Sequence, residues 1–571
     1  MKKNKIYPWR LLNIVILLLA ISCTEKFLET ELSGVSTVET YYSSVTGISE
    51  LVTGTYASFN AIVASLHNLD MMYIAFGSIA SDEAEAGGEQ GGNDIIDFQN
   101  WDKGTPQVSE PKAVSENHWA YNYKVIARAN QTLEGIAYYR ENFSSDNADT
   151  VALLNQYEGE MEFLRAFTHF KMTQVYGGVP IVDHILASSE YNITRNTVAE
   201  CLHFVQERLL VAIDLLPSKS QYAASDVGRA TKGAARALLA KAYLYESSYA
   251  ENYAGDARFA GCENKYDLAL QYAEIVINSG EYKLMGYDGE TFDTYWNQNG
   301  STIYPEATPG YRYIFTVDGE NSDECIFSVQ AVNDGANYML SRGSYLTIYT
   351  TVRNTSESTL GWGFSCPTED LLNAYDEDDP RIKVNIGRTG DSVYVLDEWV
   401  TIDCKQSPTN LIGRKYEASP EQYWSTRSHD NNGPNNFPYI RFADVLLMAA
   451  EASLKTGNAG KALEYVNMVR TRARNGASSG VPANLASVTF DDIVKERLLE
   501  LALEGHRFFD LVRWGRQEIL IGQPLQKWLG GEPQTSPVAN DFTLGVNEFF
   551  PIPQIEVINS NGSLVQYPGY E

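Results

Sequence analysis

The chain has 571 residues, of which 44% are hydrophobic and 20% are charged, so it holds ample apolar material for a folded core. Its formal net charge at pH 7 is −29. A surface this acidic repels phosphate backbones, which argues against nucleic acid as a partner. It also gains nothing from an anionic membrane surface by charge alone.

Residues 1–22 have the pattern of a secretory signal peptide. A basic start precedes an apolar run over residues 11–21. That run is shorter than the roughly 20 residues that a membrane span needs. Small residues then lead to Cys23, an arrangement that resembles a lipobox, in which the cysteine is acylated and begins the mature chain. We therefore expect a lipid on Cys23.

The match to a lipobox is loose, because Ala20 stands where that motif usually has Leu. The alternative is an ordinary signal peptide followed by an unrelated cysteine. Residues 23–36 are polar, which is typical of a flexible tether between a lipid and a folded body.

The remaining cysteines and the histidines give no sign of a metal or a disulfide framework. Five cysteines follow Cys23, an odd number without a CxxC spacing, and the seven histidines include no HxxxH pair. We expect most of these thiols to be buried, and no metal or cofactor.

Apolar residues recur every three or four positions in five segments of the first half, which predicts amphipathic helices. The second of these segments ends at a Gly-Gly-Val-Pro sequence, which is a strong stop signal. The predicted helices cover residues 118–140, 151–176, 196–216, 229–249 and 265–279.

The helical pattern returns near the C-terminus. Residues 440–455 and 459–474, separated by a Thr-Gly-Asn turn, predict a helical hairpin, and residues 490–517 predict one last long helix. Within the hairpin, the spacing of small and apolar residues resembles a tetratricopeptide repeat. The residues that carry this likeness are Leu447, Ala450, Gly457, Ala462, Val466 and Val469.

A different region, residues 281–437, separates the two helical blocks. It is rich in Gly, Asn, Asp, Tyr and Trp, with short candidate strands at residues 324–329 and 394–396. The fold class that follows is mostly α: a helical-repeat unit formed by residues 37–280 and 438–571, with a large loop-rich insertion. Functional residues gather in such insertions, and residues 76–117 are similar in character.

Aromatic residues in these loops are the best candidates for ligand contacts, since Phe, Trp and Tyr make up 12% of the chain. A sugar ring stacks its C–H face on a flat side chain, while planar polar groups pair with its hydroxyls. The candidates are Trp101 and Asp102; Tyr295, Trp296, Asn297 and Tyr304; and Trp362 between two glycines. The alternative for each ring is that it fills a core.

Two charged segments have structural interpretations. Glu504, Arg507, Asp510 and Arg513 repeat every three residues and predict ion pairs between packed helices, with Phe508, Leu511 and Val512 buried. The acidic run at residues 376–380 predicts a solvated turn or a helix cap, with a Ca²⁺ site as the alternative.

The chain also resembles a known family, the SusD/RagB family of nutrient-binding lipoproteins. The similar stretches are residues 163–180, 232–245, 443–473, 496–515, 550–554 and 568–570. The most specific of them is Glu504-Gly505-His506-Arg507-Phe508-Phe509-Asp510-Leu511-Val512-Arg513-Trp514-Gly515. With Cys23 the resemblance spans nearly the whole chain and is weakest over residues 281–437.

The resemblance implies four tetratricopeptide-like units and a place at the outer face of the outer membrane, as a lid on a SusC-like TonB-dependent transporter. It implies capture of oligosaccharides without catalysis. None of the candidate aromatic residues carries over from a family motif. A peptide receptor for the same kind of transporter remains an alternative, and a surface glycosidase is a third that no nucleophile or metal motif supports.

Overall fold

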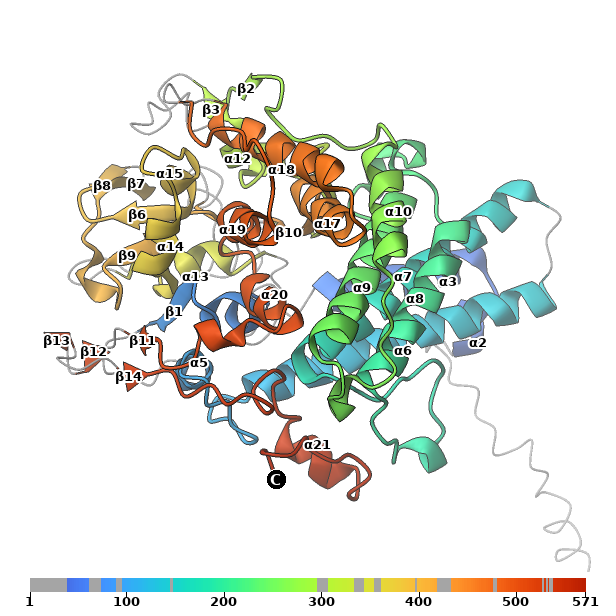
Figure 1. Ribbon diagram of the computed structural model, residues 1–571. Coiled ribbons are helices and arrows are strands. Elements are labelled where there is room, and N and C mark those ends of the chain that lie inside the picture. Colours follow the sequence, from blue (N-terminus) through green and yellow to red (C-terminus); the bar gives the residue numbers. More distant parts are fainter. Residues whose placement is uncertain are drawn as a thin grey trace, which may run out of the picture.

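The computed structural model describes most of the chain from residue 38 to the C-terminus (Figure 1). Residues 1–37, which include the predicted signal peptide, Cys23 and the predicted tether, lie outside the described residues. The described ranges are 38–60, 73–88, 95–143, 147–294, 307–332, 343–353, 361–395, 398–417, 433–475, 480–525, 528–529, 532–533 and 538–571.

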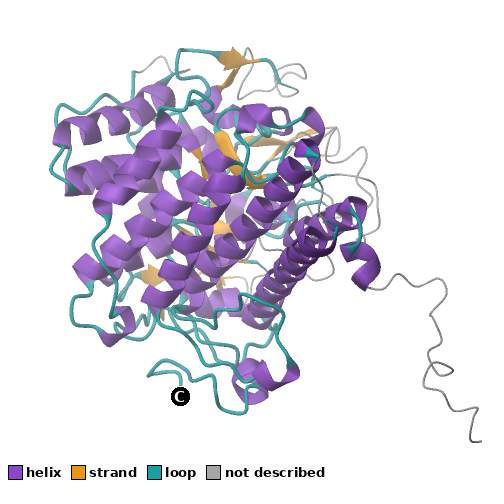
Figure 2. Cartoon of the chain, turned by 90° about the vertical axis from the view of Figure 1, so that its right-hand side faces the viewer, coloured by secondary structure: helices purple, strands orange, loops and turns teal. Residues whose placement is uncertain are grey.

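Helices in antiparallel pairs form the larger part of the molecule (Figure 2). Each helix packs on the next in the order α3, α6, α7, α8, α9, α10, and α10 then packs on α17 of the C-terminal hairpin. The helices of the first block are α2 (Val38–Tyr42), α3 (Val45–Asn60), α6 (Val114–Asn142), α7 (Ala148–Tyr176), α8 (Val198–Leu215), α9 (Lys232–Asn252) and α10 (Tyr266–Ile277). All five helices predicted there are confirmed.

Local signals set the ends of these helices. The Asn147 side chain accepts hydrogen bonds from the backbone N–H groups of Asp149 and Thr150 and so caps α7. At its other end α7 stops at Gly177, whose φ of 69° disfavours other residues. Thr197 and Glu200 form a reciprocal capping box at the start of α8.

The C-terminal hairpin consists of α17 (Phe442–Lys455) and α18 (Ala459–Arg474). Ala450 and Ala462 are fully buried, and Gly457 turns the chain with a φ of 84°. Because α10 packs on α17, residues almost 200 positions apart continue one row of helices. Like other helical repeats, each pair covers the apolar face of its neighbour. The mostly α, repeat-like fold is confirmed.

The last predicted helix, residues 490–517, is wrong as one element. The chain forms α19 (Phe490–Glu500) and α20 (Arg507–Arg513) instead. Between them Leu503 and Gly505 have φ angles of 63° and 75°, which a right-handed helix does not admit. Glu504 therefore precedes α20 and does not share a helix face with Arg507, Asp510 and Arg513.

The strands are short, and within the part of the chain that the structure describes each sheet is an antiparallel pair. Two pairs join distant segments: β1 lies against β5, and β4 against β10. The strands are β1 (Ala84–Gly87), β2 (Thr291–Phe292), β3 (Thr308–Pro309), β4 (Cys325–Val329), β5 (Phe364–Pro367), β6 (Ile386–Arg388), β7 (Ser392–Val395), β8 (Glu398–Thr401), β9 (Leu411–Gly413), β10 (Phe437–Arg441), β11 (Pro524–Leu525), β12 (Trp528–Leu529), β13 (Glu532–Pro533) and β14 (Val538–Ala539).

Short helices connect the strands and the ends of the repeats. Figure 1 shows β1 and α5, from the first hundred or so residues, beside α13 and β9 of the later loop-rich region. These helices are η2 (Ala75–Ile79), α5 (Ile96–Asp102), α12 (Gly310–Tyr313), α13 (Leu346–Thr350), α14 (Glu369–Ala374), α15 (Arg381–Asn385) and α21 (Gln554–Asn559). Single 3₁₀ turns cover η3 (Ser188–Glu190), η4 (Lys219–Gln221), η5 (Ala224–Asp226), η6 (Ala257–Phe259), η7 (Val317–Gly319), η8 (Cys404–Gln406) and η9 (Gln517–Ile519).

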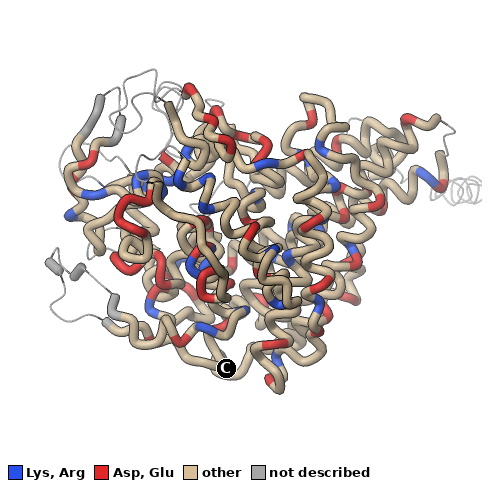
Figure 3. Tube along the Cα trace, turned by 45° about the horizontal axis from the view of Figure 1, so that its top comes forward, with Lys and Arg blue, Asp and Glu red and all other residues tan. Residues whose placement is uncertain are grey.

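Acidic positions are spread along the whole trace rather than gathered in one patch (Figure 3). The five cysteines after Cys23 are free thiols, as their spacing predicts. Within the described residues, no helix combines the length and the apolarity that crossing a membrane requires.

Candidate ligand-binding site

Trp101 lies in the hydrophobic core and does not present a ring to a ligand. The α5 helix turns it inward, where its side chain is 1% exposed. Its ring stacks on Phe76 at a centroid distance of 4.3 Å and meets the Phe550 ring edge-on at 5.2 Å. Its indole Nε1 donates to Glu110 Oε1 over 2.7 Å. The prediction that Trp101 contacts ligand is therefore wrong in this structure.

Asp102 is buried beside it. Its Oδ2 accepts from the backbone N–H of Ala86 over 3.0 Å, and its backbone carbonyl accepts from the Asn540 amide. These bonds tie α5 to β1 and to the segment after β14. Asp102 thus links elements of the fold and is not available as a ligand group, which corrects its predicted role.

Burial also shifts the pKa of Glu110, the carboxyl that accepts the hydrogen bond from Trp101. Desolvation raises the pKa of Glu110 to about 8, although hydrogen bonds from Ser115 and Trp101 oppose that shift. A carboxyl with such a pKa could serve as a proton donor only where a ligand reaches it. Glu110 is 8% exposed and is occupied by Trp101 and Ser115, so its role is structural.

Tyr295, Trp296, Asn297 and Tyr304 lie outside the described residues. The two segments that flank them are held together by the β2–β3 pair. Thr294 and Thr308 share a side-chain hydrogen bond of 2.8 Å, and the rings of Phe292 and Tyr313 stack at 4.0 Å. Both rings are half-buried, so part of this stack faces solvent.

Trp362 is half-buried and sits at the edge of an aromatic cluster, as a ligand-stacking ring would. Its ring lies 5.9 Å from the Tyr345 ring and 5.0 Å from the Tyr349 ring, both of which are buried. Its backbone N–H donates to the Ile348 carbonyl, and its own carbonyl accepts from the Arg353 guanidinium over 3.4 Å. The ring is therefore fixed on one side and open on another.

The glycines around Trp362 permit this position. A Cβ on Gly361 would lie 2.4 Å from the Thr351 carbonyl oxygen, and Gly363 has a φ of 66°. The Gly-Trp-Gly sequence gave the signal for an exposed ring. The supporting Tyr345 and Arg353 were missed, because neither belongs to a motif: Tyr345 comes directly before α13 and Arg353 follows it, and both contact Trp362 only in the folded chain.

A buried ion-pair network lies around α19 and the start of the charged motif at residues 504–514. Arg381, Arg441 and Arg472 surround Glu500, with Arg441 Nη1 at 2.7 Å and Arg381 Nη1 at 3.1 Å; Arg472 Nη2 also bonds it. Burial alone would raise the pKa of Glu500, but these guanidiniums lower it to about 2. The other anions of the network are Glu324, Glu496, Glu504 and Asp379, and its other cations are Lys415 and Arg470.

The Glu504–Trp514 motif acts structurally, as predicted. Phe508, Leu511 and Val512 are at most 2% exposed. Arg513 makes a bidentate ion pair with Glu451 of α17 at 2.6 and 2.7 Å, and Trp514 Nε1 donates to the same carboxylate. These bonds fix α20 against α17 of the C-terminal hairpin, so the motif stabilises the packing of the helices.

Two further clusters of acidic residues offer oxygen atoms that a cation could use. In the run at residues 376–380, Asp379 is buried and pairs with Arg381 at 2.8 Å, while the three residues before it are exposed. His203, Glu246 and Glu263 bring ligand atoms within 4.8 Å of one another. The Lys265 ammonium already lies 2.9 Å from Glu246 and 3.5 Å from Glu263, so an ion pair fills that place.

Comparison with known protein families matches both helical blocks. Residues 323–570 match a family model described as the SusD family, and residues 49–244 match a second model described as "Starch-binding associating with outer membrane". The two matches begin within α3 and end at the penultimate residue of the chain, and residues 245–322 between them belong to neither.

Curated relatives and solved structures agree with these matches. The chain is 24% identical to the SusD-like protein P2 of Formosa agariphila over 100% of both chains. It is 24% identical to the starch-binding protein SusD of Bacteroides thetaiotaomicron over 72% of each chain. Its fold is similar to that of surface glycan-binding protein A from Bacteroides thetaiotaomicron in complex with laminarihexaose, with a TM-score of 0.67, 22% identity and coverage of 92% of this chain and 99% of that chain.

Proposed function

Because this chain belongs to the SusD/RagB family, we propose that it captures oligosaccharides at the bacterial outer membrane and passes them, unmodified, to a TonB-dependent transporter. The observation that carries the proposal for a site is the half-buried Trp362 ring on its base of Tyr345 and Tyr349. Family members bind carbohydrate rather than catalyse its conversion.

The chemistry of Trp362 fits a sugar better than an extended peptide. The flat indole offers an apolar face for the C–H groups of a pyranose, and its tyrosine base keeps it from rotating away. The Arg353 guanidinium lies beside it and can donate to ring hydroxyls. A peptide site would instead need a groove or sheet edge that exposes backbone hydrogen-bonding groups.

Tethering makes modest affinity sufficient for capture. We propose that Cys23 carries the lipid anchor and that residues 23–36 connect it to α2. A flexible tether of this length spans about 20 Å, from roughly 5–6 Å times the square root of the residue number. A ligand released from the protein would then meet a transporter at high effective concentration.

The proposal is tested by substituting Trp362. Soluble protein beginning after Cys23 is screened on an array of neutral oligosaccharides that includes laminarihexaose and starch fragments, alongside a peptide library. The best ligand is then titrated by calorimetry. We expect Trp362→Ala to weaken binding roughly tenfold, since losing one ring stack costs about 1.4 kcal/mol, with Trp362→Phe between the two.

Tyr191→Ala is the matched control, because Tyr191 is 66% exposed and belongs to the loop before α8. It should bind like the wild type. Equal affinity of Trp362→Ala and wild type would remove Trp362 from the site. A wild-type protein that binds peptides and no glycan on the array would replace this function with the peptide-receptor alternative.

A further inference from the structure

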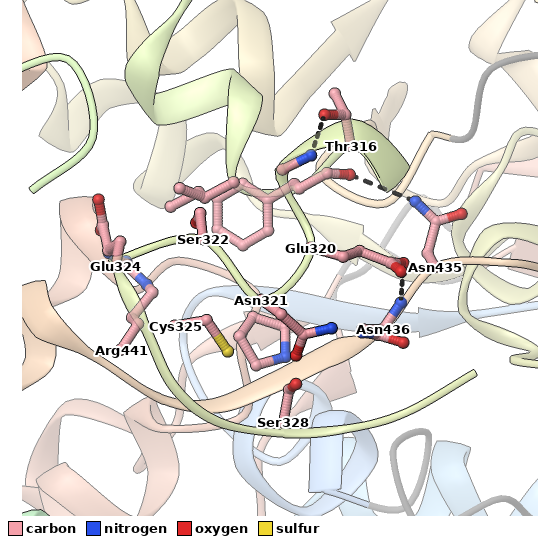
Figure 4. A pocket seen from close by; sticks show the side chains of 14 residues that line it. Thr316, Glu320, Asn321, Ser322, Glu324, Cys325, Ser328, Asn435, Asn436 and Arg441 are labelled. Carbon is pink, nitrogen blue, oxygen red and sulfur yellow. Dashed lines mark hydrogen bonds and ion pairs between the residues drawn. The ribbon is translucent and has the colours of Figure 1, made fainter. Parts of the chain in front are cut away.

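A hollow that the Trp362 site does not use lies beside the β4–β10 pair (Figure 4). Its cavity volume is about 20 Å³, and it adjoins a second, larger hollow of about 150 Å³. The two share Asn321, Cys325 and Ser328 as lining residues, so they form one groove. We call this groove the β4 groove. Its walls come from residues 314–330, residues 435–441 and the η4–η5 segment, residues 219–231.

Side-chain amides make the wall of the β4 groove rigid. Asn321 and Gln330 exchange two hydrogen bonds of 3.0 Å, and Asn436 Nδ2 donates to the same Gln330 oxygen over 3.0 Å. Gln330 also donates to Ser328 Oγ over 2.7 Å. Asn321 holds a φ of 55°, a conformation that Asn tolerates better than most residues. The planar groups are therefore fixed before any ligand arrives.

Two groups in the groove keep hydrogen-bonding capacity to spare. Ser322 Oγ is buried and has no hydrogen-bond partner among the described residues. Glu320 lines the hollow and accepts the backbone N–H of Asn436 over 2.7 Å through one oxygen (Figure 4). Burial raises the pKa of Glu320 to about 8, with the Asn436 N–H opposing and Asp318 adding to the shift. At neutral pH this carboxyl can thus donate a hydrogen bond as well as accept one.

The opposite wall supplies an apolar surface and no net charge. Tyr222 is half-buried, with its hydroxyl engaged by the Ala230 carbonyl over 2.6 Å, and Val227 is 57% exposed. The cations there are already paired: Lys219 with Asp323 at 3.5 Å, and Arg229 with Glu160 at 2.8 Å. A charged ligand would have to break these pairs, whereas a neutral one would not.

We propose that the β4 groove is a second carbohydrate subsite that takes one neutral sugar unit, separate from the Trp362 ring. This inference rests on the proposed function and adds a subsite to it. Amides and a carboxyl at one wall address hydroxyls, and Tyr222 with Val227 at the other covers an apolar sugar face. A cavity of about 150 Å³ accommodates one six-membered ring, so the larger hollow suits a single sugar unit and the smaller one has room for about one hydroxyl group.

The test uses variants that fill the groove without touching its hydrogen bonds. Ser322→Met places an apolar side chain in the hollow, and Ser322→Ala removes only the unpartnered hydroxyl. Ser188→Ala, an exposed serine of η3, is the matched control. Each soluble variant is titrated with laminarihexaose, maltohexaose and the best neutral oligosaccharide of the array. Glucose and galactose are followed by ligand-detected saturation-transfer NMR, and thermal unfolding verifies the fold of each variant.

We expect Ser322→Met to abolish the glucose or galactose NMR signal and to weaken oligosaccharide binding at least threefold. Ser322→Ala should have an intermediate effect in both measurements. Trp362→Ala should retain the monosaccharide signal. Losing one or two hydrogen bonds gives roughly a threefold to tenfold effect. If folded Ser322→Met matches wild type in both readouts while Trp362→Ala binds weakly, the groove is no subsite and the proposed function stands. If wild type gives no signal with any glycan, the proposed function falls with it.

Discussion

Substituting Glu500 tests most directly how much the buried ion-pair network stabilises the folded protein. Glu500 lies fully buried at the centre of a network of five cations and four other carboxylates, with three arginines on its two oxygens. Glu500→Gln keeps the shape of the side chain but removes its charge. Arg381, Arg441 and Arg472 would then share fewer anions in a place where water does not reach them.

The expected loss of stability is several kcal/mol. Breaking a buried ion pair by neutralising one partner costs about 3–5 kcal/mol. The pKa of Glu500 gives a second route: a change from 4.5 to about 2 corresponds to roughly 3 kcal/mol at 1.36 kcal/mol per unit. The two routes agree, so we expect Glu500→Gln to lower the free energy of unfolding by about 3 kcal/mol at pH 7.

The assay is urea unfolding followed by circular dichroism at several pH values. The folded state depresses the pKa of Glu500, so its stabilisation is fully present above pH 4.5 and is lost as the pH falls toward 2. The difference between wild type and Glu500→Gln should shrink over that interval. Glu158→Gln is the control, because its pair with Arg140 is partly exposed and is worth under about 1 kcal/mol. A Glu500→Gln loss as small as that of the control would refute the reasoning.

Three further predictions concern the groove, the core and the break before α20. Glu320→Gln should remove a pH dependence of stability. Burial raises the folded-state pKa of Glu320 to about 8, so the wild type loses free energy of unfolding as the pH rises from 4.5 to 8. In urea unfolding, the stability of the variant relative to the wild type should therefore be higher at pH 8 than at pH 5. Trp101→Ala should cost about 3–5 kcal/mol of stability through the cavity it leaves, yet titration calorimetry on the folded fraction should give wild-type affinity; weakened binding would return Trp101 to the site. Gly505→Ala should destabilise by more than about 1 kcal/mol, because a Cβ there would lie 2.5 Å from the Tyr73 carbonyl oxygen at a φ of 75°; an unchanged melting temperature would contradict this packing.

The helices could be predicted because their information is local. Apolar spacing, the Asn147 cap and the Gly177 stop act within a few residues, and α6 to α10 form where those signals place them. The break between α19 and α20 is different. A Cβ on Gly77 would lie 2.0 Å from the Gly505 carbonyl oxygen, and Gly505 N–H donates to Ser78 Oγ. Contacts more than 400 positions away thus override the helical pattern.

The candidate site was less accessible to sequence reasoning for the same reason. Trp101 looks like a loop aromatic until Phe550, almost 450 residues later, closes over it. The partial exposure of Trp362 could be predicted, because it depends on the two glycines next to it in the sequence. The β4 groove has no motif, since its amides come from residues 321, 330 and 436 and meet only after β4 pairs with β10.

The ion-pair network and the β4 groove share residues, which couples the frame to binding. Glu324 and Arg441 line the groove and also belong to the network: Glu324 bonds Arg472, and Arg441 bonds Glu500. Glu324 further accepts the Met285 backbone N–H over 2.9 Å, which ties the wall to the chain after α10. Neutralising Glu500 would therefore loosen one wall of the groove while leaving Ser322 and Gln330 in place. Because Trp362 takes no part in these ion pairs, a site built on its ring would keep its affinity as long as the protein stays folded. Glu500→Gln should thus weaken binding at the β4 groove and leave the affinity of the Trp362 site unchanged.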